Sequence, residues 1–223
     1  MSYNKSSSLY SGTHAGISTS DGSSSSLKTY DTAVAMSSPD DSGGLYAGYG
    51  GDAVAIGENS LASGSLSATI VDEGAVTTVE GAVTMIAASD SADETAFASA
   101  DTEAYIGGAE FTFSYTKEAD YSEQGPTGST ALSTSTITTV GYDLQLYGDE
   151  EGNPGSTLAE DEVEPSVEPD GSASGVDLEG NVASLDFSVQ VVADDSFVMV
   201  DAFALTVEDE LSVSTIHADL GVN

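Results

Sequence analysis

The stretch AEFTFSYTKEADYS (residues 109–122) shows the most regular alternation of apolar and polar side chains in this chain. Successive side chains of a β-strand point to opposite sides, so Phe111, Phe113 and Tyr115 would share one face and the intervening Thr and Ser residues the other. A period of two is typical of a strand with one buried face. Residues 109–122 are therefore predicted to be an antiparallel strand.

The same alternation recurs along most of the chain, and Gly, Asp, Asn and Ser separate the alternating runs. Such punctuation is typical of strands joined by short turns. The runs outside 109–122 are SLSATIV (65–71), AVTTVEGAVTMIAAS (75–89), ETAFASADTEAYIG (94–107), TSTITTVGYDLQLYG (134–148), NVASLDFSVQVVAD (181–194) and SFVMVDAFALTVEDELSVSTIHADL (196–220).

A glycine-rich stretch, SGGLYAGYGG (42–51), lies between the runs DTAVAMSS (31–38) and DAVAIG (52–57). Glycine is common in turns because it adopts backbone conformations that other residues avoid. We expect residues 42–51 to be a turn. Asp194 and Asp195 should form another, between the last two runs.

The run 196–220 is long enough for two strands, with a bend near residues 208–210. No segment sustains the i, i+3, i+4, i+7 apolar stripe of an amphipathic helix, so the helix content should be small. Many short strands with Gly and Pro turns predict an all-β fold, an antiparallel sandwich or jelly roll.

Two segments interrupt the strand pattern. Residues 1–30 form a Ser- and Gly-rich N-terminal arm, which is either flexible or packed on neighbouring subunits. Residues 149–175 combine three prolines with a dense acidic run, which predicts a projecting, solvent-exposed loop. Residues 31–223 would then be a single β-rich domain, long enough for a sizeable core.

The charge of this chain is almost entirely of one sign, with 38 acidic residues against three lysines, no arginine, and a net charge of -35. Two unit charges ~25 Å apart in water repel by ~0.2 kcal/mol, so ~600 such pairs would cost ~100 kcal/mol unscreened. A folded domain is stable by only ~5–15 kcal/mol. Molar salt shortens the Debye length to ~3 Å and removes most of this cost. The composition therefore predicts a halophilic protein.

This charge also bears on the classes of function. A nucleic-acid binder needs a basic surface, so no direct nucleic-acid binding is expected. Disorder of the whole chain is disfavoured because 39% of the residues are hydrophobic. A DNA mimic or a calcium-loaded adhesin would share the acidity, and both stay open.

Cysteine is absent, which excludes disulfides and thiolate metal sites. The first residues, MSYNKSSSLYSG, lack the apolar core of a signal peptide, so we expect synthesis in a host cytoplasm without secretion. Asn4, Lys5 and Ser6 form a glycosylation sequon that carries little weight without such a signal.

His14 and His217 are the two histidines of the chain, and no GxSxG, HExxH, P-loop or dinucleotide motif occurs. A Ser-His-Asp site would need one of these histidines in a concave pocket beside Ser and Asp. We expect His217 to be an ordinary strand residue instead. The sequence thus predicts no enzyme, no catalytic residue and no cofactor.

Carboxylate clusters could bind hard cations through oxygen. The candidates are Asp149, Glu150 and Glu151 with Asn153, and Asp194 with Asp195. The first group departs from the EF-hand pattern at Pro154, and we interpret both as solvated turns. No metal site is assigned, and weak Na, K, Mg or Ca binding between subunits stays open.

The segment AVAIGENSLASGS (53–65) resembles the head repeat of trimeric autotransporter adhesins, whose units stack as a left-handed β-roll. The matching residues are Ala53, Ala55, Ile56, Gly57, Ser60, Ala62 and Gly64. That family stacks many copies, and one good copy is present here. The resemblance implies an alternative fold, a short trimeric β-roll plus a β domain. The matching function is a receptor-binding, turret or fibre-type protein, or a halophilic cell-surface adhesin module.

The chain as a whole resembles virion structural proteins of halophilic archaeal viruses, of the single jelly-roll capsid type. The shared features are size, acidic strands rich in Ser, Thr, Gly and Ala, the N-terminal arm and the projecting loop. No motif carries the likeness, so no family residue is transferred. It implies a capsid subunit that assembles in high salt with itself and other capsid proteins in a virion. Contact with an internal viral membrane stays open.

Overall fold

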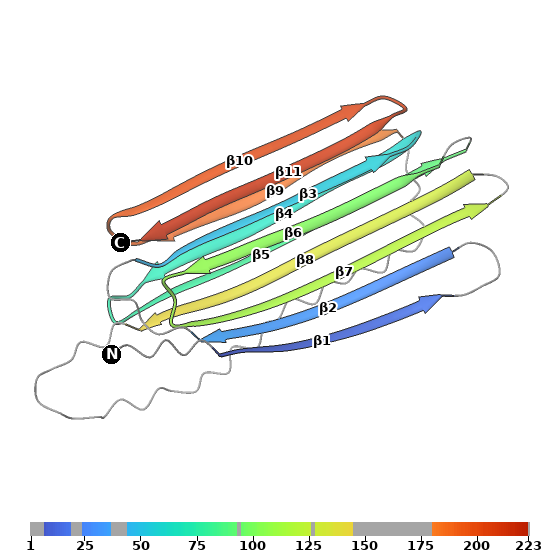
Figure 1. Ribbon diagram of the computed structural model, residues 1–223. Coiled ribbons are helices and arrows are strands. Elements are labelled where there is room, and N and C mark those ends of the chain that lie inside the picture. Colours follow the sequence, from blue (N-terminus) through green and yellow to red (C-terminus); the bar gives the residue numbers. More distant parts are fainter. Residues whose placement is uncertain are drawn as a thin grey trace, which may run out of the picture.

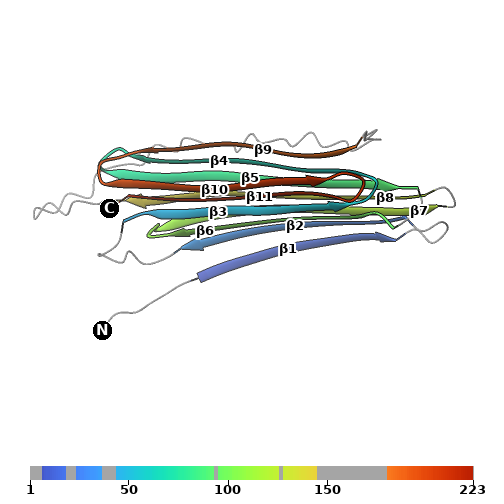
Figure 2. The same cartoon turned by 90° about the horizontal axis from the view of Figure 1, so that it is seen from above.

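The computed structural model describes residues 7–18, 24–36, 44–92, 95–125, 128–144 and 180–222, the first two ranges by their backbone. Within these ranges the chain forms eleven strands. The described residues contain no helix that is long and apolar enough to span a membrane. The strands run side by side along one long axis and make an elongated body (Figures 1 and 2).

The strands belong to two sheets that face each other. The larger sheet has the order β1-β2-β7-β8-β5-β4-β9, and the smaller sheet has the order β10-β11-β3-β6. The bounds in the larger sheet are β1 (Ser7–Ser18), β2 (Ser24–Met36), β4 (Asn59–Asp72), β5 (Val76–Ser91), β7 (Phe111–Gly125), β8 (Gly128–Leu144) and β9 (Asn181–Val192). Those in the smaller sheet are β3 (Tyr46–Ile56), β6 (Phe97–Gly107), β10 (Ser196–Val207) and β11 (Leu211–Val222).

The prediction of an all-β sandwich is confirmed. Neighbouring strands are antiparallel except β4 and β9, which pair in parallel. Sheets of seven and four strands differ from the eight strands of a jelly roll, so the sandwich is the part of the prediction that holds. The predicted turn at Asp194 and Asp195 lies between β9 and β10, and the predicted bend at residues 208–210 is the turn between β10 and β11.

Residues 46–51 of the glycine-rich stretch are not the turn that was predicted, because they belong to β3, which begins at Tyr46. Its glycines give room to large side chains. A Cβ atom on Gly48 would lie 2.1 Å from the ring of Tyr105, and one on Gly50 would lie 2.9 Å from the imidazole of His217. Glycine inside a strand often marks such a close approach, which here outweighs its preference for turns.

Part of the predicted N-terminal arm belongs to the larger sheet. The backbone of β1 pairs with β2, and β2 pairs with β7. Strand β2 therefore crosses the boundary drawn between residues 30 and 31. The acidic loop 149–175 and the candidate ligands Asp149, Glu150, Glu151 and Asn153 lie outside the described residues.

Strand β7 has the faces that its alternation predicted, but their orientation was not foreseen. Phe113 pairs with Val140, whereas Ser114 pairs with Thr139, which is buried between the sheets. The aromatic face therefore points away from the smaller sheet. Strands β7, β2 and β1 lie beyond β6, where no described strand of the smaller sheet covers them (Figure 1).

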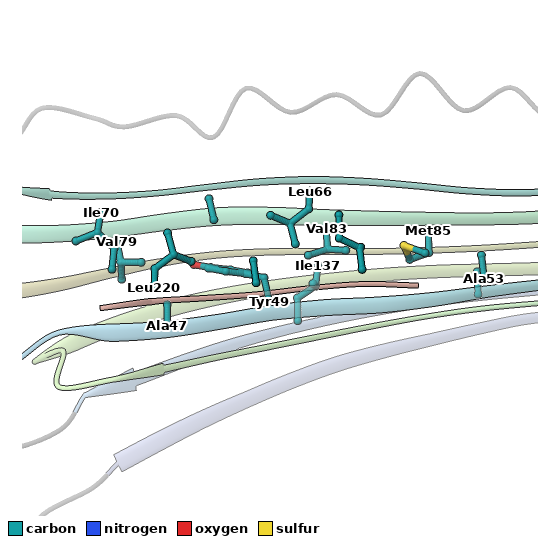
Figure 3. Packing of buried hydrophobic residues seen from close by; sticks show 14 of the residues in the cluster. Ala47, Tyr49, Ala53, Leu66, Ile70, Val79, Val83, Met85, Ile137 and Leu220 are labelled. Carbon is teal, nitrogen blue, oxygen red and sulfur yellow. The ribbon is translucent and has the colours of Figure 1, made fainter. Parts of the chain in front are cut away.

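The core between the sheets combines a few large side chains with many small ones (Figure 3). Tyr49, Ile70, Val79, Val83 and Met85 are fully buried. Alanine fills much of the remaining space, at positions 47, 53, 55, 62, 68, 87 and 218. Small side chains let the sheets approach closely enough for serine hydroxyls to bond across them. Ser214 of β11 donates to the carbonyl of Ala62 in β4 at 2.9 Å.

Candidate functional site

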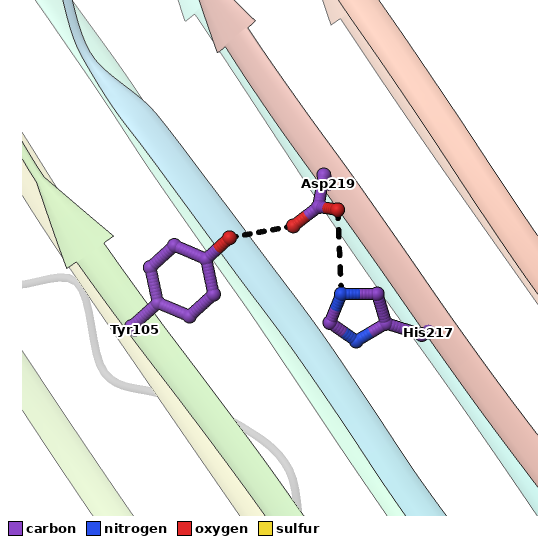
Figure 4. A network of polar contacts seen from close by, with 3 residues as sticks. All are labelled: Tyr105, His217 and Asp219. Atoms are coloured by element: carbon purple, nitrogen blue, oxygen red, sulfur yellow. Dashed lines mark hydrogen bonds and ion pairs between the residues drawn. The ribbon is translucent and has the colours of Figure 1, made fainter.

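His217 lies in β11 on the outer face of the smaller sheet, where it joins a small polar network (Figure 4). Its Nε2 atom is 3.3 Å from Oδ2 of Asp219, two residues further along the same face. The other oxygen of Asp219 accepts a 2.6 Å hydrogen bond from the hydroxyl of Tyr105 in β6. Gly50 separates His217 from Glu103, since a Cβ atom there would lie 2.9 Å from His217 Nδ1 and 3.1 Å from Glu103 Oε1.

The surroundings of His217 differ from the concave Ser-His-Asp pocket considered in the sequence analysis. The hydrogen bond to Asp219 raises the pKa of Tyr105 to about 12, because it stabilises the protonated phenol, which is the donor. His217 lies on an exposed sheet face with 39% of its side chain accessible, not in a concave pocket. The neighbouring Ser212 and Ser214 point to the opposite face and bond backbone carbonyls of β4. His217 is thus a strand residue paired with Asp219. His14 lies in β1, where its backbone pairs with Thr29.

An open groove of about 390 Å³ lies elsewhere, at one end of the sandwich. Glu58, Asp90 and Glu123 bring carboxylates to its wall. All three are bonded within the chain. Asp90 accepts from Asn59 Nδ2 at 2.7 Å, Glu58 accepts from the amide of Ala92 at 3.3 Å, and Glu123 accepts from the hydroxyl of Tyr121. The sequence did not single out these acids, since they are far apart in the chain: Glu58 lies in the turn before β4, Asp90 near the end of β5 and Glu123 near the end of β7.

Metal-binding geometry was searched among the residues that the structure describes. No group of three or more His, Asp or Glu side chains there is arranged to hold an ion. Asp194 and Asp195 form the turn before β10, and Asp195 has a φ of 50°. Their position matches the solvated turn that the sequence predicted.

The outer face of the smaller sheet carries many exposed apolar side chains. Cross-strand registers place Phe197, Gly221, Tyr46 and Gly107 in one row at one end of this face. Large apolar residues exposed on the face are Tyr46, Ile56, Phe97, Tyr105, Phe197, Met199, Phe203, Leu205 and Val207. Acidic residues lie in the middle of the face, between its two apolar ends. There, Asp52 of β3 is directly opposite Asp101 of β6. We call this surface the outer apolar face.

The sandwich is also open along one edge. Strand β10 ends the smaller sheet and β9 ends the larger sheet, and the two strands pack across each other. Val198 on β10 is 47% exposed and Phe187 on β9 is 48% exposed. We call this pair of strands the β9–β10 edge.

No protein-family model matches this chain, and comparisons with curated proteins and with solved structures also find no match. Its class is therefore defined by the fold alone, an all-β sandwich of two sheets with an acidic sequence. Function is inferred from the chain's own residues.

Proposed function

We propose that this chain is a structural virion protein, a capsid subunit of a halophilic virus that assembles with copies of itself in high salt. The observation that carries the proposal is the outer apolar face. Phe197, Met199 and Phe203 are each more than half exposed on this face. Large apolar side chains that are exposed together at the ends of a sheet face are typical of an interaction site. In a shell, neighbouring subunits would cover it.

The charge supports high salt as the condition for assembly. Subunits with a net charge of -35 repel each other strongly in dilute buffer. At molar ionic strength the Debye length of ~3 Å confines this repulsion to touching groups. Apolar contacts then decide whether subunits associate. The expected partners are copies of this chain and other capsid proteins, and the scarcity of basic residues argues against direct contact with nucleic acid.

The test is the size of the purified chain in ~3 M salt, measured by light scattering and electron microscopy. We expect multi-subunit particles. A Phe97→Ser variant, which changes the outer apolar face at the exposed end of β6, should reduce particle formation, while Ser67→Ala on the exposed side of β4 should not. A stable monomer in molar salt would contradict the proposal.

A fibre or turret-type trimer is the second candidate, and the segment 53–65 favours it. Gly57 and Glu58 alone join β3 to β4, which lie in different sheets. Ala53, Ala55, Ser60 and Ala62 on either side of this turn are 0% exposed. These four residues are among those that match the head repeat of the β-roll. A discrete mass of three subunits in light scattering would favour this candidate over a shell.

A further inference from the structure

The two edge strands of the smaller sheet, β6 and β10, differ in the hydrogen bonds of their outer backbone groups. At β6, side chains of β8 satisfy backbone amides, since Ser133 Oγ accepts from the amide of Ala100 at 3.0 Å and Ser129 Oγ accepts from that of Ala96 at 2.7 Å. At the other end, β10 has one strand neighbour among the described residues, β11. Its outer row of amide and carbonyl groups therefore faces outward.

The sequence of β10 lacks the features that usually protect an edge strand. Natural sheets block edges with lysine, proline, bulges or very short strands. Strand β10 is SFVMVDAFALTV, twelve residues with neither lysine nor proline, and Asp201 is its one charge. Strand β9 likewise holds one charge, Asp186. In a chain with 38 acidic residues, the β9–β10 edge is a stretch of low charge.

Core-facing side chains are also exposed at this edge. Val198 pairs with Leu220, which is 0% exposed and points between the sheets, yet Val198 itself is 47% exposed. Phe187 pairs with the buried Leu66 and shares its inward face, yet it is 48% exposed. The apolar interior therefore continues to the surface along the β9–β10 edge.

We propose that the β9–β10 edge binds a second copy of this chain by antiparallel pairing of the two β10 strands about a two-fold axis. The smaller sheet then continues from one molecule into the next. The β9 strands of the two copies face each other across the same edge, which covers Phe187. This inference rests on the proposed function in one respect, that the chain associates with itself.

Strand β10 is complementary to itself in this orientation. With Ala202 opposite Ala202 of the second copy, Phe197 lies opposite Val207 and Met199 opposite Leu205. Asp201 lies opposite Phe203, so the two carboxylates do not face each other directly. Directly opposed apolar pairs stabilise an antiparallel ladder and directly opposed like charges destabilise it. Self-complementarity of this kind is what a two-fold interface requires.

The edge is large enough for a stable dimer. Twelve residues at ~3.4 Å each give a length of ~40 Å, and two sheets ~10 Å apart with their side chains give a height of ~20 Å. The product is ~800 Å² per molecule, about the size of a standard stable interface.

Cross-linking at a single introduced cysteine tests the register, because the chain has no cysteine of its own. Opposed residues in an antiparallel ladder have Cα atoms ~4.5–5.5 Å apart, within the range of a disulfide. Ala202→Cys should therefore form a covalent dimer under mild oxidation in ~3 M salt. Ala204→Cys is the matched control on the same face, since it would lie opposite Val200 and not opposite itself. Absence of a cross-link at Ala202 would overturn the proposed pairing.

Self-association of a double variant provides the second test. Met199→Asp with Phe203→Asp changes two exposed side chains, so the circular dichroism should be unchanged. We expect self-association to weaken at least ~10-fold, as when apolar residues at the centre of an interface are lost. Phe97→Asp at the opposite end of the same face should leave the dimer intact. If the double variant associates at the same protein concentration as the wild type, the inference is overturned.

The outcomes separate this inference from the proposed function. Dimers that cross-link at Ala202 but form no larger particle would support the edge and contradict the shell. Large particles that form in the wild type, with no cross-link at position 202 in Ala202→Cys, would support the shell and contradict the edge. A monomeric wild type in molar salt would contradict both.

Discussion

Tyr49 is the largest fully buried side chain in the described core, and its ring lies against Gly81 of the opposite sheet. A Cβ atom on Gly81 would be 2.3 Å from Tyr49 Cζ. The ring cannot move aside, because it is enclosed and its hydroxyl accepts a 3.0 Å hydrogen bond from Thr139. Here a glycine in a strand reflects packing between sheets, and alternation along one strand cannot show that.

Gly81→Ala should therefore lower the free energy of unfolding by ~1–3 kcal/mol, the usual cost of overpacking a core. Chemical denaturation in molar salt measures this. Gly125→Ala is the control, because a Cβ atom there meets only an ordinary contact at 3.7 Å. If the two variants are equally stable, the residues around Tyr49 adjust to the added methyl group and this prediction is wrong. A second change, Tyr49→Ala, should make Gly81→Ala less harmful.

Tyr49 should also make stability depend on alkaline pH. Burial raises its pKa from 10.0 to about 12, an effect opposed by the Thr139 hydrogen bond and assisted by Glu80. The unfolded chain loses the proton first, so this stabilisation is complete below pH 10 and is lost as the pH rises through 12. The loss should be roughly 2–3 kcal/mol. Denaturation series from pH 9 to about pH 12.5 should be flatter for Tyr49→Phe than for wild type, and parallel curves would contradict this assignment.

At the scale of elements, the positions of most strands could be predicted from sequence. The runs 75–89 and 181–194 correspond to β5 and β9, because a half-buried strand leaves its period of two in the sequence. Strand β1 leaves no such signal in a Ser- and Gly-rich stretch. Alternation also cannot show which face of β7 points to the second sheet, since that depends on how far the smaller sheet extends.

The serine hydroxyls that accept hydrogen bonds from backbone amides at the β6 edge could not be predicted either, because serine is abundant throughout the sequence. Ser133 accepts from the amide of Ala100 and donates to Asp120 at 2.6 Å. Ser133→Ala should cost ~1–3 kcal/mol, because it leaves a buried amide without its partner. Ser67→Ala, on the exposed side of β4, should change stability by less than ~0.5 kcal/mol. Hydrogen exchange at Ala100 should rise in the first variant alone, and unchanged exchange there would argue against this role.

At the scale of the whole molecule, the charge makes stability depend on salt. Dialysis to below ~0.2 M monovalent salt should loosen the fold or dissociate the assembly, because the Debye length grows to ~8 Å. Circular dichroism and light scattering across a salt titration measure the two effects separately. Unchanged spectra and particle size in dilute buffer would refute this. Rescue by millimolar calcium in place of molar sodium would instead point to specific cation sites.

The order of strands in the smaller sheet has a consequence for how the chain folds. Strand β3 lies between β6 and β11, and β11 is the last of the described strands in sequence order. In the larger sheet, β4 pairs with β9 across a separation of 121 residues. Contacts this distant in sequence make folding slow, since long loops must close before they form. A ribosome must therefore release the chain as far as β11 before β3 gains its second neighbour. We expect a long-lived intermediate with an unfinished small sheet during synthesis.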